Sequence, residues 1–426
     1  MSTASDMVAN TGQPPGTNLP GNLAAGGKKP RDIRLDFFRG AGMFIIFFAH
    51  MPLNGWANYI PARFGFSDAT EIFVFCSGMA SALAFGRLFA ERGFLLGLSR
   101  IAFRCWQVYW AHIGLFLVVT TAMVAVDQAL ETGTAFQGGI NVLPFVEVNT
   151  GQQLMGLFTL TYVPNLFDIL PMYLVILAMI PIVMALSRVN PGLVFLFMAV
   201  TWILAFFGRL DLPAEPWSDR VWYFNPFSWQ LVFFTGFAFM RGWIPAPPIN
   251  RALIWVCAAI VIVIIPFAHW PTVNSYQFIR DTRDAIEPLL NKTHFGPLRY
   301  IHFLALAYLA YALAGPGGVN IKAAPGVKVV CKVGQQALGV FMASILLSML
   351  GGVALNVMGA TTFNIALVNI IGCALMVAVA YTAAYFKSSP WQKPRHIRDV
   401  GRDVNPVVPN TGGRGAGGNV RGEAVS

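Results

Sequence analysis

Long apolar runs alternate with short polar segments along most of this chain. There are ten such runs, at roughly residues 37–54, 69–89, 101–126, 166–187, 191–209, 227–244, 250–270, 297–315, 335–357 and 362–386. Most of them approach the ~20 residues that an α-helix needs to cross the hydrocarbon core of a bilayer. The pattern predicts an all-α, polytopic integral membrane protein with about ten transmembrane helices.

Both ends of the chain lack this apolar pattern. Residues 1–30 are rich in Gly, Pro and Asn and contain no short apolar core before a cleavage site. We therefore expect a disordered cytoplasmic segment there and not a cleaved signal peptide. The Gly- and Arg-rich tail, residues 390–426, is expected to be disordered and cytoplasmic as well. Residues 31–389 between these segments form the predicted membrane domain.

The distribution of Lys and Arg predicts which side of the membrane each loop faces. When alternate loops are assigned to opposite sides, 22 of the 29 basic residues fall on the side of both termini and 7 on the other. Because cytoplasmic loops carry the excess of Lys and Arg, both termini are predicted to be cytoplasmic. The net charge of +10 reflects this bias, and no nucleic acid partner is needed to explain it.

Composition supports a membrane protein and offers no metal or disulfide framework. Hydrophobic residues make up 56% of the chain and charged residues 11%, which is less than half the charge of an ordinary soluble domain. The five cysteines show no paired spacing, so we read them as packing residues. We expect no metal and no permanently bound cofactor.

The first apolar run carries two ionisable side chains, Arg39 and His50. They are eleven residues apart, which is about 16 Å along an α-helix and close to three whole turns, so both side chains share one face. Ionisable groups inside a membrane are costly and usually mark functional sites. The predicted topology places Arg39 near the cytoplasm and His50 near the outer side.

The second run begins with Ser67-Asp68-Ala69-Thr70-Glu71. An Asp followed three residues later by Glu, just before an apolar run, is typical of a helix N-terminus, where both carboxylates accept hydrogen bonds from free backbone N–H groups. The short preceding loop also returns this helix start to the side of His50. Asp68 or Glu71 is therefore expected either to cap the helix, to orient the imidazole, or both.

Several segments resemble one known family. They are RDIRLDFFRG, FFAHMPLN, FGFSDATEIFVFCSG, RCWQVYWAHI, DILPMYLVIL, FNPFSWQLVFFTG and LRYIHFLALAYL, spread from about Arg31 to about Tyr385. The chain resembles the OpgC family, membrane proteins related to the acyltransferase-3 superfamily that succinylate osmoregulated periplasmic glucans. The resemblance implies a multi-pass protein of the bacterial inner membrane that transfers an acyl group, with succinyl-CoA or another acyl-CoA as co-substrate and a glucan or other glycan as acceptor.

The resemblance also implies a site for the donor. The matching third helix of acyltransferase-3 proteins carries an arginine pair near the donor, so Arg100 and Arg104, together with Arg39, are expected to bind the coenzyme A phosphates. Arg100 and Arg104 are one helical turn apart on a common face. His112, two turns deeper, is an alternative catalytic group, although such histidines are more often hydrogen-bonded between helices.

Four residues near the predicted outer side are candidates for contacting the acceptor. Asp168 and Tyr173 lie at the start of the fourth run, and Asn225 and Trp229 open the sixth. Aromatic residues at such depths are ordinary interface anchors, but their ring faces also suit the CH groups of a sugar. The polar loop 271–296 is long enough to form a lid.

The sequence favours transmembrane O-acyl transfer, with His50 as general base. A neutral imidazole, whose unperturbed pKa is about 6.5, can take the proton of a sugar hydroxyl as the new C–O bond forms. An acyl-imidazole on His50 is an alternative. The rival function is a transporter or flippase for an anionic or sugar solute, whose path the same residues would line. The sequence leaves a homo-oligomer open.

Overall fold

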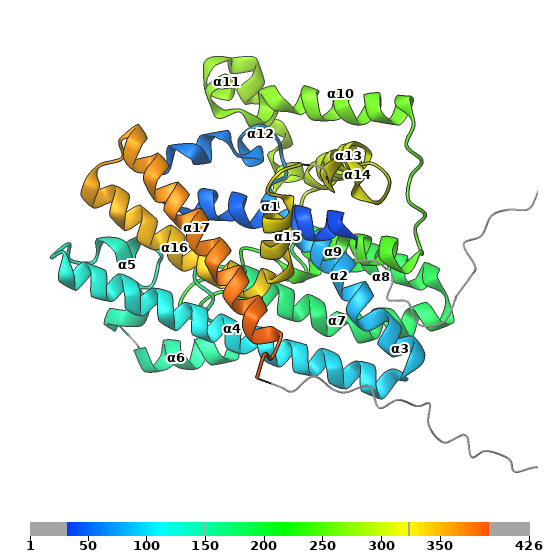
Figure 1. The fold of residues 1–426 in the computed structure, drawn as a ribbon, viewed down its shortest axis with the longest axis horizontal. Helices are drawn as coiled ribbons and strands as arrows, with labels where there is room; N and C mark the ends of the chain where they lie inside the picture. The colour runs from blue at the N-terminus through cyan, green and yellow to red at the C-terminus, as the bar shows by residue number, and fades with distance from the viewer. Residues whose placement is uncertain (1–31, 149, 323, 392–426) are drawn as a thin grey trace, which may run out of the picture. The chain divides into compact units, whose positions relative to one another are not determined.

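The computed structural model describes residues 32–148, 150–322 and 324–391. The predicted disordered segment 1–30 and the tail from residue 392 lie outside the described residues. In chain order the α-helices are α1 (Ile33–His50), α2 (Ala69–Ser81), α3 (Arg87–Glu91), α4 (Phe94–Ala129), α5 (Ala135–Gly139), α6 (Thr150–Thr159), α7 (Ile169–Val189), α8 (Pro191–Phe206), α9 (Pro226–Arg241), α10 (Arg251–Ala268), α11 (Trp270–Ser275), α12 (Gln277–Leu290), α13 (Pro297–Ala314), α14 (Val319–Lys322), α15 (Val327–Gln335), α16 (Ala337–Met358) and α17 (Thr362–Lys387) (Figure 1). The described residues contain no β-strand, only one isolated bridge between Pro213 and Val221.

The predicted all-helical membrane architecture is confirmed, and each of the ten apolar runs forms a helix. Within the described residues, seven helices are long and apolar enough to cross a membrane: α2 continued through α3, α4, α7, α10, α13, α16 and α17. Helix α8 is apolar but has 16 residues, and α9 also has 16. Helix α1 has 18 residues, but Arg34, Asp36 and Arg39 lower its hydropathy. The count of ten spans and the cytoplasmic termini stay predictions.

Helix α1 lies in the middle of the helix packing and ends at His50. It packs against α2, α15 and α16, and buries Met43, Ile46 and Phe47 in the main hydrophobic core. Asp32 begins the helix by accepting a hydrogen bond from the Arg34 backbone N–H at 3.0 Å. The packing of α1 sets the direction in which its last turn projects His50.

Helices α2 and α9 approach each other closely because small residues lie between them. A Cβ atom added at Gly78 would lie 1.9 Å from the Phe233 carbonyl oxygen, and one added at Gly236 would lie 2.3 Å from that of Phe75. Backbones come this close in membrane proteins where glycine removes the side chain from the interface. The contact holds the start of α2 against the elements that surround the site.

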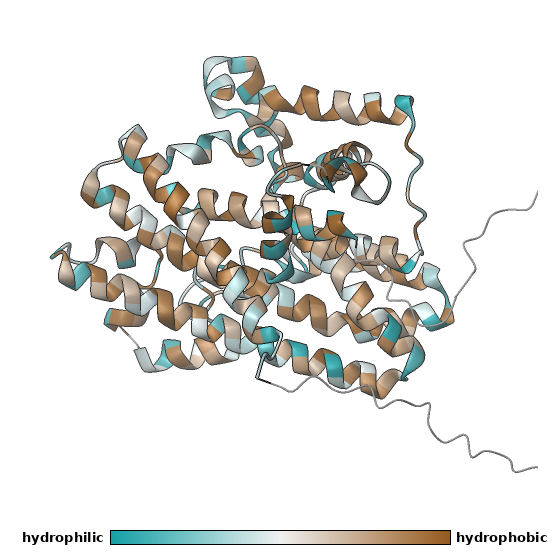
Figure 2. Ribbon diagram, viewed as in Figure 1, coloured by the Kyte–Doolittle hydropathy of each residue, from teal (hydrophilic) through white to brown (hydrophobic). Residues whose placement is uncertain are grey.

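Helix α10 differs from the central helices because most of its apolar side chains are exposed. Figure 2 shows its ribbon as largely hydrophobic, with hydrophilic colour at its first turn. Only 11% of its apolar stretch is buried within the protein, so its outer surface is suited to contact lipid tails.

The loop predicted to act as a lid is largely helical. It contains α11 and the amphipathic α12, which is followed by Asn291 to Phe295. Helix α12 packs against α10, α11 and α13, and its last residue, Leu290, is buried with Phe66 and Ala268. The segment after α12 therefore reaches the interior of the protein.

Substituting Gly78 with Ala is expected to destabilise the protein. The added methyl group has no room beside the Phe233 carbonyl, and overpacking of this kind costs about 1–3 kcal/mol. Thermal unfolding in detergent should show a lower Tm for Gly78→Ala. Gly114→Ala is the matched control, because a Cβ at Gly114 meets nothing within 4 Å. An equal Tm for both variants would contradict the close approach of α2 and α9.

Candidate active site

A cavity of about 760 Å³ lies where α1 ends. Its size falls within the ~300–1,000 Å³ typical of small-molecule sites. The walls come from the ends of α1 and α4, the starts of α2 and α7, α5, most of the length of α16, the loops after α1 and α5, and the loops before α7, α9 and α13. Its polar and ionisable lining residues include His50, Thr70, Asn165, Asp168, Tyr223, Lys292 and Asn356.

The imidazole of His50 is held in one tautomer by the backbone. Its Nδ1 lies 2.8 Å from the Ile46 carbonyl oxygen, one turn earlier in α1. Because a carbonyl oxygen only accepts, Nδ1 carries the hydrogen and donates it. The neutral ring therefore has its lone pair on Nε2, the nitrogen that a general base would use.

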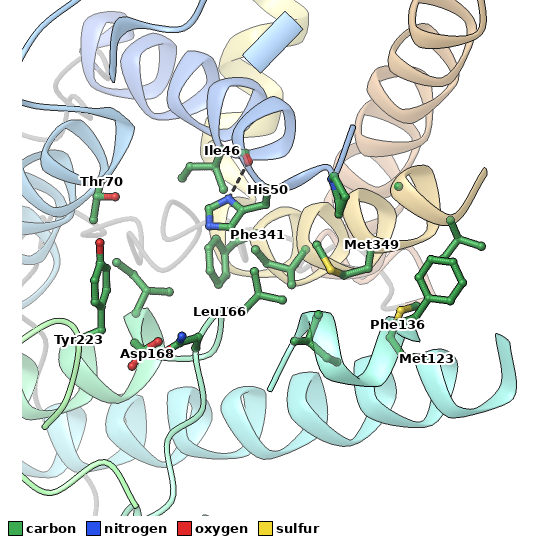
Figure 3. Close-up of a pocket in the computed structure, with 18 of the residues that line it drawn as sticks. Ile46, His50, Thr70, Met123, Phe136, Leu166, Asp168, Tyr223, Phe341 and Met349 are labelled. Atoms are coloured by element: carbon green, nitrogen blue, oxygen red, sulfur yellow. Dashed lines mark hydrogen bonds between the residues drawn. The ribbon is translucent and has the colours of Figure 1, made fainter. Parts of the chain in front are cut away.

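Several polar side chains lie toward one side of the cavity, and two methionines lie toward the other. Figure 3 shows His50 projecting into the cavity from α1, with Thr70, Asp168 and Tyr223 toward one side. Met123, Phe136 and Met349 lie toward the other side in this view. A ligand with one hydroxyl-rich part and one apolar part would match this division.

The two carboxylates at the start of α2 form the predicted capping box. Asp68 accepts a hydrogen bond from the Thr70 backbone N–H at 2.7 Å, and Glu71 accepts one from the Asp68 N–H at 2.8 Å. The capping role expected from the sequence is therefore present. In the described residues, neither carboxylate is hydrogen-bonded to His50, whose Nδ1 is occupied by Ile46. The orientation that we expected from a carboxylate is supplied by the backbone carbonyl.

The same carboxylates are part of a buried cluster of four charges. Glu71, which is fully buried, accepts hydrogen bonds from Arg299 Nε at 2.9 Å and Nη2 at 2.6 Å. Asp68 Oδ2 contacts Lys292 Nζ at 2.5 Å and Arg299 Nη2 at 3.5 Å. The two carboxylates and the two cations balance each other, and their attraction offsets the cost of removing them from water.

Asp68 and Lys292 lie outside the membrane-spanning segments, and their neighbours in the cluster determine their charge. Burial by itself would raise the pKa of Asp68, but Lys292 and Arg299 outweigh it and hold this pKa well below its usual range. Burial would lower the pKa of Lys292, but Asp68 reverses the effect and the pKa is raised. Lys292 therefore presents a protonated ammonium group to the cavity.

Asn225 and Trp229, expected to contact the acceptor, instead hold the segment that carries Lys292. Trp229 is fully buried and its Nε1 donates to the Lys292 carbonyl at 2.9 Å. Asn225 donates its backbone N–H to the Thr293 carbonyl at 3.2 Å and its side-chain amide to Leu210 and Asp211. Neither residue lines the cavity. We therefore assign both to positioning and not to glycan contact.

Asp168 and Tyr173, the other expected acceptor contacts, differ in position. Asp168 lines the cavity, is 3% exposed, and its Oδ1 has no hydrogen-bond partner among the described residues. Tyr173 packs edge-on against Phe233 with ring centroids 6.0 Å apart and does not line the cavity. Only Asp168 is therefore available to a ligand there.

The three arginines expected to bind the donor do not line this cavity. Arg100 is exposed, and half-buried Arg104 donates to Gln107 at 3.2 Å. Met123, the residue of α4 that reaches the cavity, is 19 residues beyond Arg104, which is about 28 Å along the helix. Arg39 is likewise about 16 Å from His50 along α1. Phosphates bound at these arginines would lie far from the imidazole.

Sequence reasoning missed the importance of Lys292, Tyr223 and Arg299. The signal for Arg299 was the buried carboxylate itself, since Glu71 in an apolar run requires a cationic partner. Lys292 and Tyr223 lie in polar loops, where nothing in the local sequence distinguishes them from exposed residues. Three or more His, Cys, Asp or Glu side chains do not gather as a metal site anywhere in the described residues.

Glu71→Gln is expected to destabilise the protein strongly, because it leaves the Arg299 guanidinium without its main partner. Breaking a buried ion pair by removing one member costs about 3–5 kcal/mol. The double variant Glu71→Gln with Arg299→Gln should recover part of this loss. Unfolding in detergent measures the loss of stability in the single variants and in the double variant. Strictly additive losses would show that the two residues do not stabilise each other.

Comparison with known proteins identifies the family of this chain. No curated protein and no solved structure matches the chain. The OpgC protein family matches residues 31–388, which is most of the sequence and includes every residue of the cavity and the charged cluster. Membership in this family implies an acyltransferase-type enzyme that modifies periplasmic glucan. The chain therefore belongs to the OpgC family and is a helical membrane protein of this type.

Proposed function

We propose that this protein transfers an acyl group, succinyl in the simplest case, from a cytoplasmic acyl-CoA to a hydroxyl of a periplasmic glucan. The observation that carries the proposal is the His50 imidazole in the large cavity, with Nδ1–H bonded to Ile46 and Nε2 left as the base. A general base needs a fixed tautomer and access to the proton that it takes. His50 meets both requirements.

The chemistry is direct transfer in a complex of enzyme, donor and acceptor. Nε2 takes the hydroxyl proton while the sugar oxygen attacks the thioester carbonyl and forms a tetrahedral intermediate. The C–S bond then breaks, and the thiolate of coenzyme A takes the proton back from the imidazolium. No cofactor and no covalent enzyme intermediate is required, so the cycle returns His50 to its starting state.

The division of the cavity matches the two substrates. The acyl chain and the end of the pantetheine arm would occupy the apolar part around Met123, Phe136 and Met349. The sugar would occupy the polar part, where the unpaired Asp168 oxygen can accept a hydrogen bond from a hydroxyl. The ring of Tyr223 offers a face for the sugar CH groups.

The donor would enter from the cytoplasmic side. Arg39, Arg100 and Arg104 are the proposed ligands for the coenzyme A phosphates, because guanidinium groups bind phosphate in a bidentate manner. They precede the cavity residues by about 16 Å along α1 and about 28 Å along α4, so the pantetheine arm would have to extend toward His50. The acceptor would enter from the outer side.

His50→Ala is expected to reduce transfer by about 10²–10⁴-fold, because the variant lacks the general base. Transfer is measured by mass spectrometry of glucan after incubation with acyl-CoA, and folding is checked by thermal unfolding. His294→Gln is the control, since His294 bonds Asp211 and does not line the cavity. More than about one per cent residual activity in His50→Ala would argue against this role.

In sealed vesicles of known orientation, acyl-CoA should support transfer only from the face that bears the termini, and soluble glucan should accept only on the other face. The reason is that the proposed donor arginines and His50 lie at different depths of the helices. The measurement is acylation of glucan with each substrate supplied to one face at a time. Transfer with both substrates on one face would contradict this arrangement. A transporter would need no acyl-CoA binding at all.

A further inference from the structure

A second, smaller pocket lies behind the charged cluster. It has a volume of about 100 Å³, below the range of complete ligand sites, so it can receive a substituent but not a whole substrate. It lies between the loop before α2, the α10–α11 junction, α12 and the start of α13. Its lining includes Ser67, Asp68, Trp270, Arg283, Leu290 and Arg299.

Arg299 contributes a partly used guanidinium to this pocket. The residue is 9% exposed, and its Nε and Nη2 bond Glu71 and Asp68. Its Nη1 has no hydrogen-bond partner among the described residues. The group therefore keeps donors for a ligand while its position is fixed by the carboxylates.

Arg283 faces the same pocket from α12. Its Nη1 donates to the Phe267 carbonyl at 2.6 Å, and its guanidinium lies 4.9 Å from the centre of the Trp270 ring. Its other N–H groups bond no described residue. Burial lowers the pKa of Arg283, and the positive charge of Arg299 lowers it further against the opposing effect of Asp284 and Glu287. Two like charges thus face one small polar space.

Among the described residues that line the pocket, Asp68 carries the only carboxylate, and both of its oxygens are already bonded. Asp68 Oδ1 accepts from the Thr70 N–H, and Oδ2 is shared by Lys292 and Arg299. Ser67 is occupied as well, since its Oγ lies 2.7 Å from His302 Nδ1. Arg299 is already balanced by Glu71 within the cluster of four charges, so the excess positive charge at this pocket comes from Arg283, and an anion held by both guanidinium groups would neutralise it.

We propose that this pocket is a carboxylate-binding subsite, which holds an acidic substituent already present on the glycan acceptor. Two guanidinium groups at one small pocket match a carboxylate in size and charge, and arginine binds carboxylates in a bidentate manner. Asp68 connects the two sites, because its Oδ2 contacts both Arg299 in this pocket and Lys292 in the main cavity.

The identity of the ligand rests on the proposed function. Transfer of a dicarboxylic acyl group leaves a free carboxylate on each modified sugar. A glycan modified once would then carry the group that the subsite recognises, while another hydroxyl of the same chain reaches His50. The subsite therefore favours acceptors that are already partly acylated.

Binding is tested without any transfer reaction. Succinate, acetate and chloride are titrated into the purified full-length protein in detergent at constant ionic strength, with calorimetry as the readout. Saturable binding of the two carboxylates is expected, about tenfold weaker in Arg283→Gln and partly restored in Arg283→Lys. Arg280→Gln is the matched control, because Arg280 is on the same helix, bonds Asn274 and does not line the pocket. Equal affinity in wild type and Arg283→Gln would overturn the subsite.

The source of the carboxylate is tested by kinetics with neutral and partly succinylated glucan. Wild type should show a lower KM for the succinylated acceptor, and Arg283→Gln should raise this KM about tenfold while kcat and the KM for neutral glucan stay unchanged. Carboxylate binding with equal KM values for both acceptors would overturn the assignment to the acceptor. Absence of transfer to either glucan would refute the proposed function and leave the binding result to decide the subsite.

Discussion

The buried contact between Glu71 and Arg299 is the interaction on which the arrangement of both pockets depends. A carboxylate with no exposed surface requires a cation at hydrogen-bond distance, and Arg299 supplies it with two donors. This contact joins the first turn of α2 to the first turn of α13, more than 200 residues later. Because Asp68 and Lys292 complete the cluster, the start of α2 and the segment after α12 are held together as well.

Residues of the charged cluster form part of the lining of two separate pockets. Lys292 and Thr70 line the large cavity, while Asp68 and Arg299 line the small one. Asp68 and Glu71 therefore cap α2 and also neutralise Lys292 and Arg299. The guanidinium group of Arg299 still has N–H groups that can donate to a ligand. His50 approaches the large cavity from α1 and takes its orientation from its own helix. An imidazole held by a backbone carbonyl keeps its geometry when the charges around it change.

Much of the fold was predictable from the sequence. Apolar runs of nearly 20 residues specify helices, since a membrane leaves the backbone few other ways to satisfy its hydrogen bonds. The signature Asp68–Glu71 specified a helix start, and the capping box is present. These features depend on local sequence, so no knowledge of distant partners was needed.

The candidate site was only partly predictable. His50 was identified because an ionisable residue inside an apolar run is costly, and Asp168 because it lies at the predicted outer start of an apolar run. Asn225 and Trp229 have the right chemistry for a sugar, but their partners in the segment 291–295 turn them inward. Lys292 and Tyr223 become cavity residues through contacts between loops far apart in the chain. The sequence by itself determined which segments are helical and which charges need explanation. Only the tertiary structure decided which of those charges meet, because the partner of a buried charge is set by packing across hundreds of residues and not by spacing along one helix.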